Sequence, residues 1–342
     1  MSPLQTRAAD GPALRVERLR VVYPVRRGPW RAAIDLVALD DVSFELHAGE
    51  SLGIVGESGC GKSTLARAVL QLVAPSAGRI SWLGQPLEQR SRAELRALRS
   101  GLQIVFQNPL ASLDPRMTVL DLVSEPLREF RPDLASEARV DVVRRTLERV
   151  GLTGEMLRRY PHEFSGGQCQ RIGIARALVL EPQLLVCDEP VSALDVSVQA
   201  QIVNLLQRLR RELRLSLLFI SHNLALVRHL SQRVLVLYLG RVMEIAGRDE
   251  LFDRARHPYT QALLGSIPIP DPQRARAHPA APLGGELPSP LHPPSGCVFR
   301  TRCAWVQEAC ANTVPVLEQV TPEHGVACWR WREIAATSKG GE

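Results

Sequence analysis

The chain has 342 residues, of which 45% are hydrophobic and 23% charged, and it carries a formal net charge of +6. This composition is typical of a soluble globular protein of about two domains, and no apolar run approaches the roughly 18 residues of a membrane-spanning helix. The positive charge favours nucleic acid or anionic lipid, but the arginines are dispersed along the chain, so nucleic acid is not expected as a partner. The N-terminus lacks a basic and apolar leader, so we expect a cytoplasmic protein.

The first part of the chain predicts a small β subdomain. Residues 1–13 show no hydrophobic period and are expected to form a flexible leader. Residues 14–25 and 38–46 alternate between apolar and polar side chains, which is typical of two strands of a hairpin-rich sheet. A basic insertion that contains Trp30 lies between them.

A glycine-rich segment follows the next predicted strand, residues 51–55. It matches the G-x-x-x-x-G-K-[ST] pattern, whose glycines let backbone N–H groups turn toward phosphate. A helix predicted over residues 63–72 places that phosphate at its N-terminus. We therefore expect a nucleotide site in which Lys62 reaches the terminal phosphates and Ser63 coordinates Mg²⁺. The candidate cofactor-binding residues of this segment are Gly56, Glu57, Ser58, Gly59, Cys60, Gly61, Lys62, Ser63 and Thr64.

Strands and helices alternate in the chain that follows. Strands are predicted over residues 80–83, 102–106, 184–187 and 215–220, and helices over residues 136–150, 167–180 and 198–213. This alternation predicts a parallel core sheet. The fold class is therefore α/β, with an N-terminal antiparallel β subdomain, an inserted α-helical subdomain at about residues 108–180 and a C-terminal extension. Residues 14–255 are expected to form the nucleotide-binding domain.

Polar residues at the ends of predicted strands complete the site. Asp188 follows an apolar strand and can hold, with Ser63, the Mg²⁺ that bridges the phosphates, while Glu189 can orient and deprotonate the attacking water. His222 follows the next apolar strand, where its imidazole can contact the γ-phosphate. Gln107 follows residues 102–106, where its amide can contact Mg²⁺ and water while its backbone hinges. The candidate catalytic residues are therefore Glu189, His222, Gln107 and Lys62.

An aromatic ring is the expected partner of the adenine base. Tyr23 lies on a predicted strand before the glycine-rich segment and can stack on adenine. It is followed by Pro24 and by the insertion, so Trp30 is the alternative stacking ring.

A second glycine-rich segment, residues 164–168, reads FSGGQ and precedes an apolar helix. It has no use in a P-loop enzyme that works alone. It resembles the signature of ABC-transporter ATPases, whose serine and amides complete the nucleotide site of an opposing subunit. The resemblance assigns five residues to the partner's site, in trans: Ser165, Gly166, Gly167, Gln168 and Asp195.

The order of these motifs resembles the ABC ATPase family over residues 14–255. Segments at 106–118, 162–171, 257–263 and 293–303 look like the F-type ATPase subunit of bacterial oligopeptide and dipeptide permeases. That resemblance implies an importer subunit that hydrolyses ATP to ADP and phosphate at the cytoplasmic face of the cell membrane. Its implied partners are a second, non-identical ATP-binding subunit, two integral-membrane permease subunits and an extracytoplasmic peptide-binding protein. Peptide as cargo rests on the resemblance alone.

From about residue 256 the chain becomes rich in proline, which predicts an appended region, residues 256–342, that is not part of the sheet. It carries four of the seven cysteines, Cys297, Cys303, Cys310 and Cys328. Four thiolates without a C-x₂-C pair are compatible with a [4Fe–4S] cluster, with zinc or with free thiols. Some peptide-importer ATPases that this chain resembles carry such a cluster.

The remaining cysteines lie in the predicted nucleotide-binding domain. Cys60 is flanked by glycines of the phosphate loop, and its position near phosphates and a helix N-terminus can lower its pKa and raise its reactivity. The simpler interpretation is a small, tolerated residue. Cys169 and Cys187 are expected to be packing residues.

Alternative functions remain open at this point. Related importer subunits serve nickel or other small solutes, because the selective pocket lies in other chains. A soluble ABC ATPase of DNA repair or translation usually has tandem cassettes or a long coiled coil, and an exporter ATPase is normally fused to spanning helices; neither pattern is visible here. A noncatalytic subunit is disfavoured because Lys62, Asp188, Glu189 and His222 are all in place.

Overall fold

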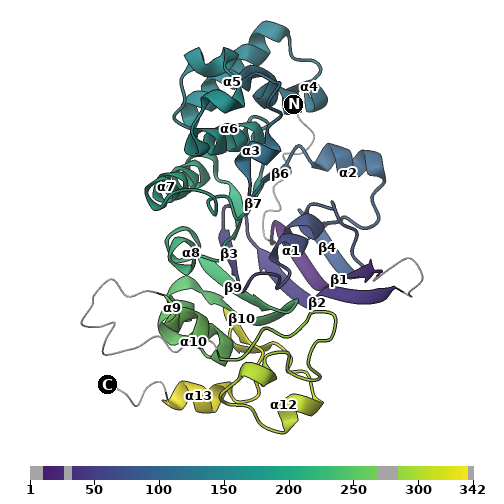
Figure 1. The fold of residues 1–342 in the computed structure, drawn as a ribbon. Coiled ribbons are helices and arrows are strands. Elements are labelled where there is room, and N and C mark those ends of the chain that lie inside the picture. Colours follow the sequence, from purple (N-terminus) through teal and green to yellow (C-terminus); the bar gives the residue numbers. More distant parts are fainter. Residues whose placement is uncertain (1–10, 27–32, 268–283, 338–342) are drawn as a thin grey trace.

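The computed structural model describes residues 11–26, 33–267 and 284–337, which form two sheets flanked by helices (Figure 1). One sheet has four strands in the order β2-β1-β4-β5, and the other has eight in the order β11-β12-β10-β9-β3-β8-β7-β6. Most of the predicted leader and the alternative ring Trp30 lie outside the described residues.

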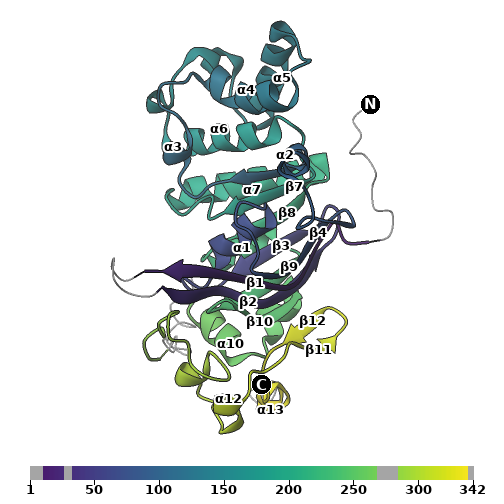
Figure 2. The same ribbon diagram turned by 90° about the vertical axis from the view of Figure 1, so that its right-hand side faces the viewer.

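The four-stranded sheet is the antiparallel β subdomain that the alternating residues predict. β1 (Leu14–Val25) pairs antiparallel with β2 (Ile34–Leu46) and with β4 (Ala77–Trp82), and the short β5 (Gln85–Pro86) pairs with β4. Figure 2 shows β1 and β2 as a long pair of strands that crosses the molecule in front of the second sheet. The inner side chains of these strands join the core of the second sheet, so the two sheets are one packed unit.

Five parallel strands form one side of the eight-stranded sheet, with β6 at its edge. They are β6 (Leu102–Val105), β7 (Leu184–Asp188), β8 (Ser216–Ile220), β3 (Ser51–Val55) and β9 (Arg233–Tyr238). β3 lies between β8 and β9 and pairs in parallel with both. Every residue of β3, β7 and β8 is buried, as expected for parallel strands with both faces covered.

The sheet is mixed rather than wholly parallel, and the prediction that the C-terminal region is not part of it is wrong. β10 (Arg241–Gly247) runs antiparallel to β9, and β12 (His324–Val326) and β11 (Glu318–Thr321) continue the sheet beyond it. The physical reason is that, without β12, the outer edge of β10 would have N–H and C=O groups without hydrogen-bond partners in the sheet. A three-residue strand is too short for its alternation to be read from sequence.

Helices cover both faces of the second sheet and form a separate layer above it in Figure 1. The upper layer contains α3 (Pro109–Ser112), α4 (Val119–Phe130), α5 (Ser136–Arg149), η1 (Gly154–Arg158), η2 (Pro161–Glu163) and α6 (Gly166–Leu178). The helices that flank the sheet are α1 (Lys62–Val69), α2 (Arg92–Leu98), α7 (Val196–Leu213), α8 (Leu224–Leu230), α9 (Arg248–Arg254) and α10 (Pro258–Gly265). The C-terminal region adds η3 (Arg300–Arg302), α12 (Ala309–Asn312) and α13 (Trp331–Thr337).

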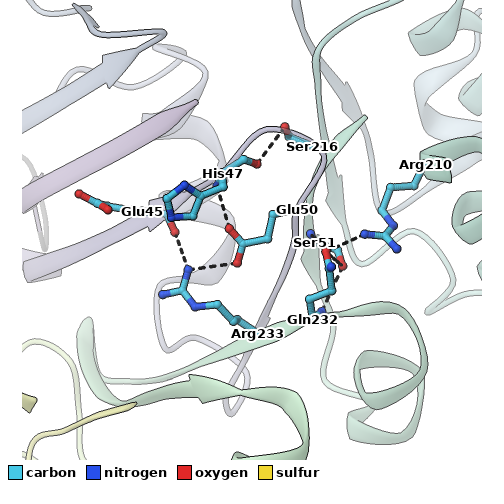
Figure 3. Close-up of polar contacts among 8 residues, drawn as sticks. All are labelled: Glu45, His47, Glu50, Ser51, Arg210, Ser216, Gln232 and Arg233. Carbon is cyan, nitrogen blue, oxygen red and sulfur yellow. Dashed lines mark hydrogen bonds and ion pairs between the residues drawn. The ribbon is translucent and has the colours of Figure 1, made fainter. Parts of the chain in front are cut away.

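A polar network fixes the start of β3, at the end opposite to the glycine-rich loop (Figure 3). The carboxylate of Glu50 accepts hydrogen bonds from the backbone N–H of His47, at 2.7 Å, and from the Arg233 guanidinium, at 3.0 Å. Ser51 and Gln232 exchange further bonds, and Arg210 donates to Gln232 at 2.7 Å. These contacts join the β2–β3 corner to β9 and to the end of α7, so they set the position from which β3 enters the loop.

We predict that Glu50→Ala lowers the free energy of unfolding by about 2 kcal/mol, because it leaves the Arg233 guanidinium half-buried and without its carboxylate partner. Glu45→Ala is the matched control, since the Glu45 side chain is 42% exposed and pairs with Arg15 at the surface. The control should change stability by less than about 0.5 kcal/mol. Urea unfolding of both variants measures the difference, and equal effects would contradict the buried role of Glu50.

Candidate functional site

The glycine-rich loop connects β3 to α1 and has a backbone that only glycine tolerates at two points. Gly61, the residue before α1, has φ of 108°, and a Cβ there would lie 2.5 Å from the carbonyl oxygen of Ala38. A Cβ on Gly56 would lie 2.1 Å from the carbonyl oxygen of Leu237. The loop is therefore enclosed by neighbouring backbone, which keeps its shape fixed.

Lys62 begins α1 and turns back over the loop. Its Nζ donates to the carbonyl oxygens of Gly56, at 2.8 Å, and Glu57, at 2.9 Å, and the residue is 5% exposed. A buried ammonium needs such partners. The side chain thus spans the concave side of the loop, where phosphate oxygens can replace or supplement the carbonyls.

Asp188 and Ser63 meet across the sheet although they are far apart in sequence. The Ser63 hydroxyl donates to the Asp188 carboxylate at 3.0 Å. Burial raises the pKa of Asp188, and the adjacent Glu189 carboxylate adds to the rise, while the Ser63 hydrogen bond and the Arg67 and Lys62 charges oppose it. A buried carboxylate and a hydroxyl in contact are oxygen donors of the kind that Mg²⁺ takes.

Glu189 is the point at which three of the candidate catalytic residues meet. Its carboxylate accepts a hydrogen bond from the Gln107 side-chain amide at 3.0 Å, and its Oε2 lies 3.4 Å from Nδ1 of His222. Its backbone has φ of 47°, in the left-handed region, and its N–H donates to the carbonyl oxygen of Ile220 at 3.0 Å. Such an unusual conformation in a non-glycine residue aims the side chain away from the direction of β7.

An open cavity of about 300 Å³ lies over the loop. Most of the predicted site residues line it, namely Tyr23, Ser58, Gly59, Gly61, Lys62, Ser63, Thr64, Gln107 and Glu189. Sequence reasoning missed the rest of the lining, which is Leu36, Val37, Ala38, Leu239, Gly240 and Pro290. These residues form no motif, and they come to the loop from β2, from the turn between β9 and β10, and from the C-terminal region.

The signature segment lies apart from this cavity, in the layer of helices above the sheet (Figure 1). The Ser165 hydroxyl accepts from the Gln168 N–H at 3.4 Å, and the Gln168 side chain accepts from the Ser165 N–H at 3.0 Å, which is a capping box at the start of α6. Ser165 is exposed, as is Asp195 at the start of α7. None of residues 165–168 lines the cavity over the loop of the same chain.

Cys60 does not have the environment of a reactive thiol. It is 2% exposed, and burial raises its pKa more than the nearby Lys62 ammonium lowers it. The idea that the phosphate loop activates this thiol is therefore not supported, and Cys60 is a small packed residue of the loop. Cys169 and Cys187 are fully buried in the core, as expected for packing residues.

The four C-terminal cysteines are among the residues that line a cavity of about 20 Å³. Burial raises the pKa of Cys297 to about 11 and that of Cys328 to about 12, so the thiol form is favoured in the absence of a metal. Within the described residues, no group of three or more His, Cys, Asp or Glu side chains is arranged to hold a metal ion. The donor set suits a metal cluster, but this arrangement of the side chains does not.

The chain matches two known families. Residues 39–192 match the family described as ABC transporter, and residues 243–310 match the oligopeptide/dipeptide transporter, C-terminal region. A dimeric structure of the ATP-binding cassette MJ0796 bound to ADP and phosphate has a TM-score of 0.62 and 27% identity, covering 69% of this chain and 98% of the other. The cbiO1 protein from Clostridium perfringens has a TM-score of 0.62 and 30% identity, covering 71% and 92%. The fold and the phosphate loop therefore define an ABC-type ATPase.

Curated relatives are similar over nearly the full length. The oligopeptide transport ATP-binding protein OppF of Salmonella typhimurium is 53% identical over 318 residues, which cover 92% of this chain and 95% of that protein. OppF of Haemophilus influenzae is 54% identical over 293 residues, covering 86% and 88%, and AppF of Bacillus subtilis is 48% identical over 325 residues, covering 94% and 98%. The chain belongs to the ATP-binding subunits of oligopeptide ABC transporters. Among the described residues, no helix is both long and apolar enough to span a membrane.

We predict that Asp188→Asn raises the melting temperature of the nucleotide-free and metal-free protein at neutral pH. The raised pKa means that the folded state binds this proton more readily than the unfolded state, so stability falls as the pH rises from the ordinary carboxyl pKa to the raised one. The gap between variant and wild type should close as the pH falls through the raised pKa of Asp188 toward the ordinary carboxyl pKa, because the folded state then holds the proton. Asp195→Asn, exposed at the start of α7, is the control and should show no such gap. A lower melting temperature for Asp188→Asn at neutral pH would contradict this account.

Proposed function

We propose that this subunit binds MgATP in the cavity over its phosphate loop and hydrolyses it only when a second ATP-binding subunit closes on that cavity. The observation that carries the proposal is the separation of the two glycine-rich segments. The phosphate loop lines the cavity, whereas Ser165 is exposed at the start of α6, in a different layer of the same chain. An exposed helix N-terminus with free N–H groups suits the phosphates of a nucleotide held by another subunit.

The roles of the individual residues follow from their positions. Lys62 binds the terminal phosphates, and Ser63 and Asp188, with Gln107, would hold a Mg²⁺ ion, which would supply positive charge beside the phosphates. Glu189 orients and deprotonates water, while Gln107 and His222 contact its carboxylate and keep it aimed at the γ-phosphate. Tyr23 stacks on the adenine at the edge of the cavity. The segment 165–168 and Asp195 serve the nucleotide of the partner subunit.

The transport role of the subunit involves a cargo and several partner chains. We propose oligopeptides as the cargo, with a non-identical ATP-binding subunit, two permease subunits and an extracytoplasmic peptide-binding protein as partners. The names of the curated relatives and the matched C-terminal family support peptide over nickel or another small solute, and over a role in DNA repair or translation. The subunit then lies at the cytoplasmic face of the cell membrane. Residues 14–255 act as the nucleotide-binding domain and residues 256–342 as the transporter-specific domain.

Glu189→Gln should lower ATP turnover of the assembled transporter about 100-fold or more, because an amide cannot accept the proton of the attacking water. MgATP binding should be retained, since Gln has nearly the same shape and can still accept from Gln107. Lys62→Ala should lose MgATP binding itself.

Glu181→Gln is the surface control for that experiment, because its carboxylate is 70% exposed and pairs only with Arg149. It should turn over ATP at the wild-type rate. Normal turnover by Glu189→Gln in the assembled transporter would overturn the assignment of the base.

We also propose that the four C-terminal cysteines can hold a [4Fe–4S] cluster. The support is that the four cysteines line one cavity, and the required change is a rearrangement of the side chains, since the present cavity is only about 20 Å³. Protein purified without oxygen should contain iron and sulfide and absorb near 400 nm, and Cys303→Ser should lose that absorbance. Full-length protein that contains neither iron nor sulfide after such a purification would reject the cluster.

A further inference from the structure

Two residues of the C-terminal region, Arg302 and Tyr259, contact the phosphate loop at Glu57. The Arg302 guanidinium pairs with both carboxylate oxygens of Glu57, at 2.6 Å and 3.0 Å. The Tyr259 hydroxyl accepts a hydrogen bond from the Glu57 N–H at 2.9 Å. Arg302 and Tyr259 are 245 and 202 residues away in sequence, so no local pattern could have predicted either contact.

Every polar group of Glu57 is therefore occupied. Its carboxylate is held by Arg302, its N–H by Tyr259, and its carbonyl oxygen by the Nζ of Lys62 at 2.9 Å. Gly56 precedes Glu57 in the loop, and its carbonyl oxygen also accepts a hydrogen bond from the Nζ of Lys62. Any shift of Glu57 must change the position of the lysine that faces the nucleotide.

The ion pair is a strong one by its geometry and burial. The Arg302 side chain is 5% exposed and that of Glu57 is 24% exposed. Two parallel N–H···O bonds between a guanidinium and a carboxylate fix orientation as well as distance. The hydrogen bonds to Glu57 also raise the pKa of Arg302 above its usual range.

The Arg302 side chain is held in place by other contacts of the C-terminal region and β9. Its Nε donates to the carbonyl oxygen of Gly284 at 3.0 Å, and its guanidinium lies over the ring of Tyr238 at 5.9 Å. Tyr238, Tyr259 and Phe299 form a packed aromatic cluster in which ring centroids are 4.6 Å to 5.3 Å apart. Figure 2 shows the segment around α12 below β10 and α10. The aromatic cluster joins this region to β9 of the second sheet, so the position of Arg302 beside Glu57 is fixed by packing.

We propose that Arg302 is a positioning residue for nucleotide binding, which acts through Glu57 to hold the first half of the phosphate loop and to neutralise a carboxylate beside the phosphates. The inference rests on the proposed binding of MgATP by this loop. The ATP affinity of the subunit then depends on the docked C-terminal region. Without Arg302, the loop loses an anchor and gains an unpaired negative charge where a polyanion must bind.

The first test is MgATP binding to the full chain by titration calorimetry. Arg302→Ala should weaken binding about ten-fold, the scale of one lost charged hydrogen-bonding partner. Arg302→Lys keeps the charge but not the paired geometry, so it should recover part of the affinity. Arg300→Ala is the matched control, because Arg300 lies in the same short helix and its guanidinium donates to Ser295 rather than to Glu57. It should bind as the wild type does.

A double-mutant cycle tests the route through Glu57. Because the unpaired carboxylate is part of the defect, Arg302→Ala combined with Glu57→Gln should bind MgATP no more weakly than Arg302→Ala alone. In the assembled transporter, Arg302→Ala should raise KM for ATP about ten-fold and change kcat less than about two-fold. Additive losses in the cycle, or unchanged affinity of Arg302→Ala, would overturn the proposal.

Hydrogen exchange separates a loosened loop from an undocked C-terminal region. In Arg302→Ala, amides of residues 56–61 should exchange faster while those of β10 and β12 keep their protection. Faster exchange of β12 with an unchanged loop would overturn the proposal. Failure of the wild type to bind MgATP, or wild-type binding by Lys62→Ala, would instead reject the proposed nucleotide site, so the two failures are distinguishable.

Discussion

The structure depends on one constraint, which is that the loop between β3 and α1 keeps a fixed shape while its concave side stays open to a ligand. A loop that offers donors to a ligand cannot satisfy them internally, so its shape must be held by neighbours. β3 provides this by its position between β8 and β9, fully buried on both faces. The network around Glu50 fixes one end of that strand, and the contacts of Lys62 and Glu57 fix the loop at the other.

The proposed catalytic residues are brought together by the parallel order of the sheet. The carboxyl ends of β3, β6, β7 and β8 meet at one edge, so residues that follow these strands become neighbours. Gln107 lies just beyond β6, Asp188 ends β7 and Glu189 follows it, and His222 lies just beyond β8. The left-handed backbone at Glu189 then directs its carboxylate toward Gln107 and His222.

The C-terminal region is part of the nucleotide-binding unit rather than an appendage to it. β12 pairs with β10, Pro290 lines the cavity over the loop, and Arg302 and Tyr259 contact Glu57. Cys303 follows Arg302 directly, so the cysteine group and the ion pair lie on the same short segment. A structural change at the cysteines would therefore occur next to the residue that contacts the phosphate loop.

The sequence by itself determined the class of fold and most of the site. Buried strands and the glycine-lysine-serine spacing are local patterns, and each of them predicts its element without knowledge of the rest of the chain. Only the tertiary structure decided that the sheet is mixed, that Cys60 is buried beyond easy reaction, and that Glu57 is held from the far end of the chain. These features depend on strand pairing, on burial by other elements or on contacts between residues far apart in the chain, and neither composition nor periodicity carries that information.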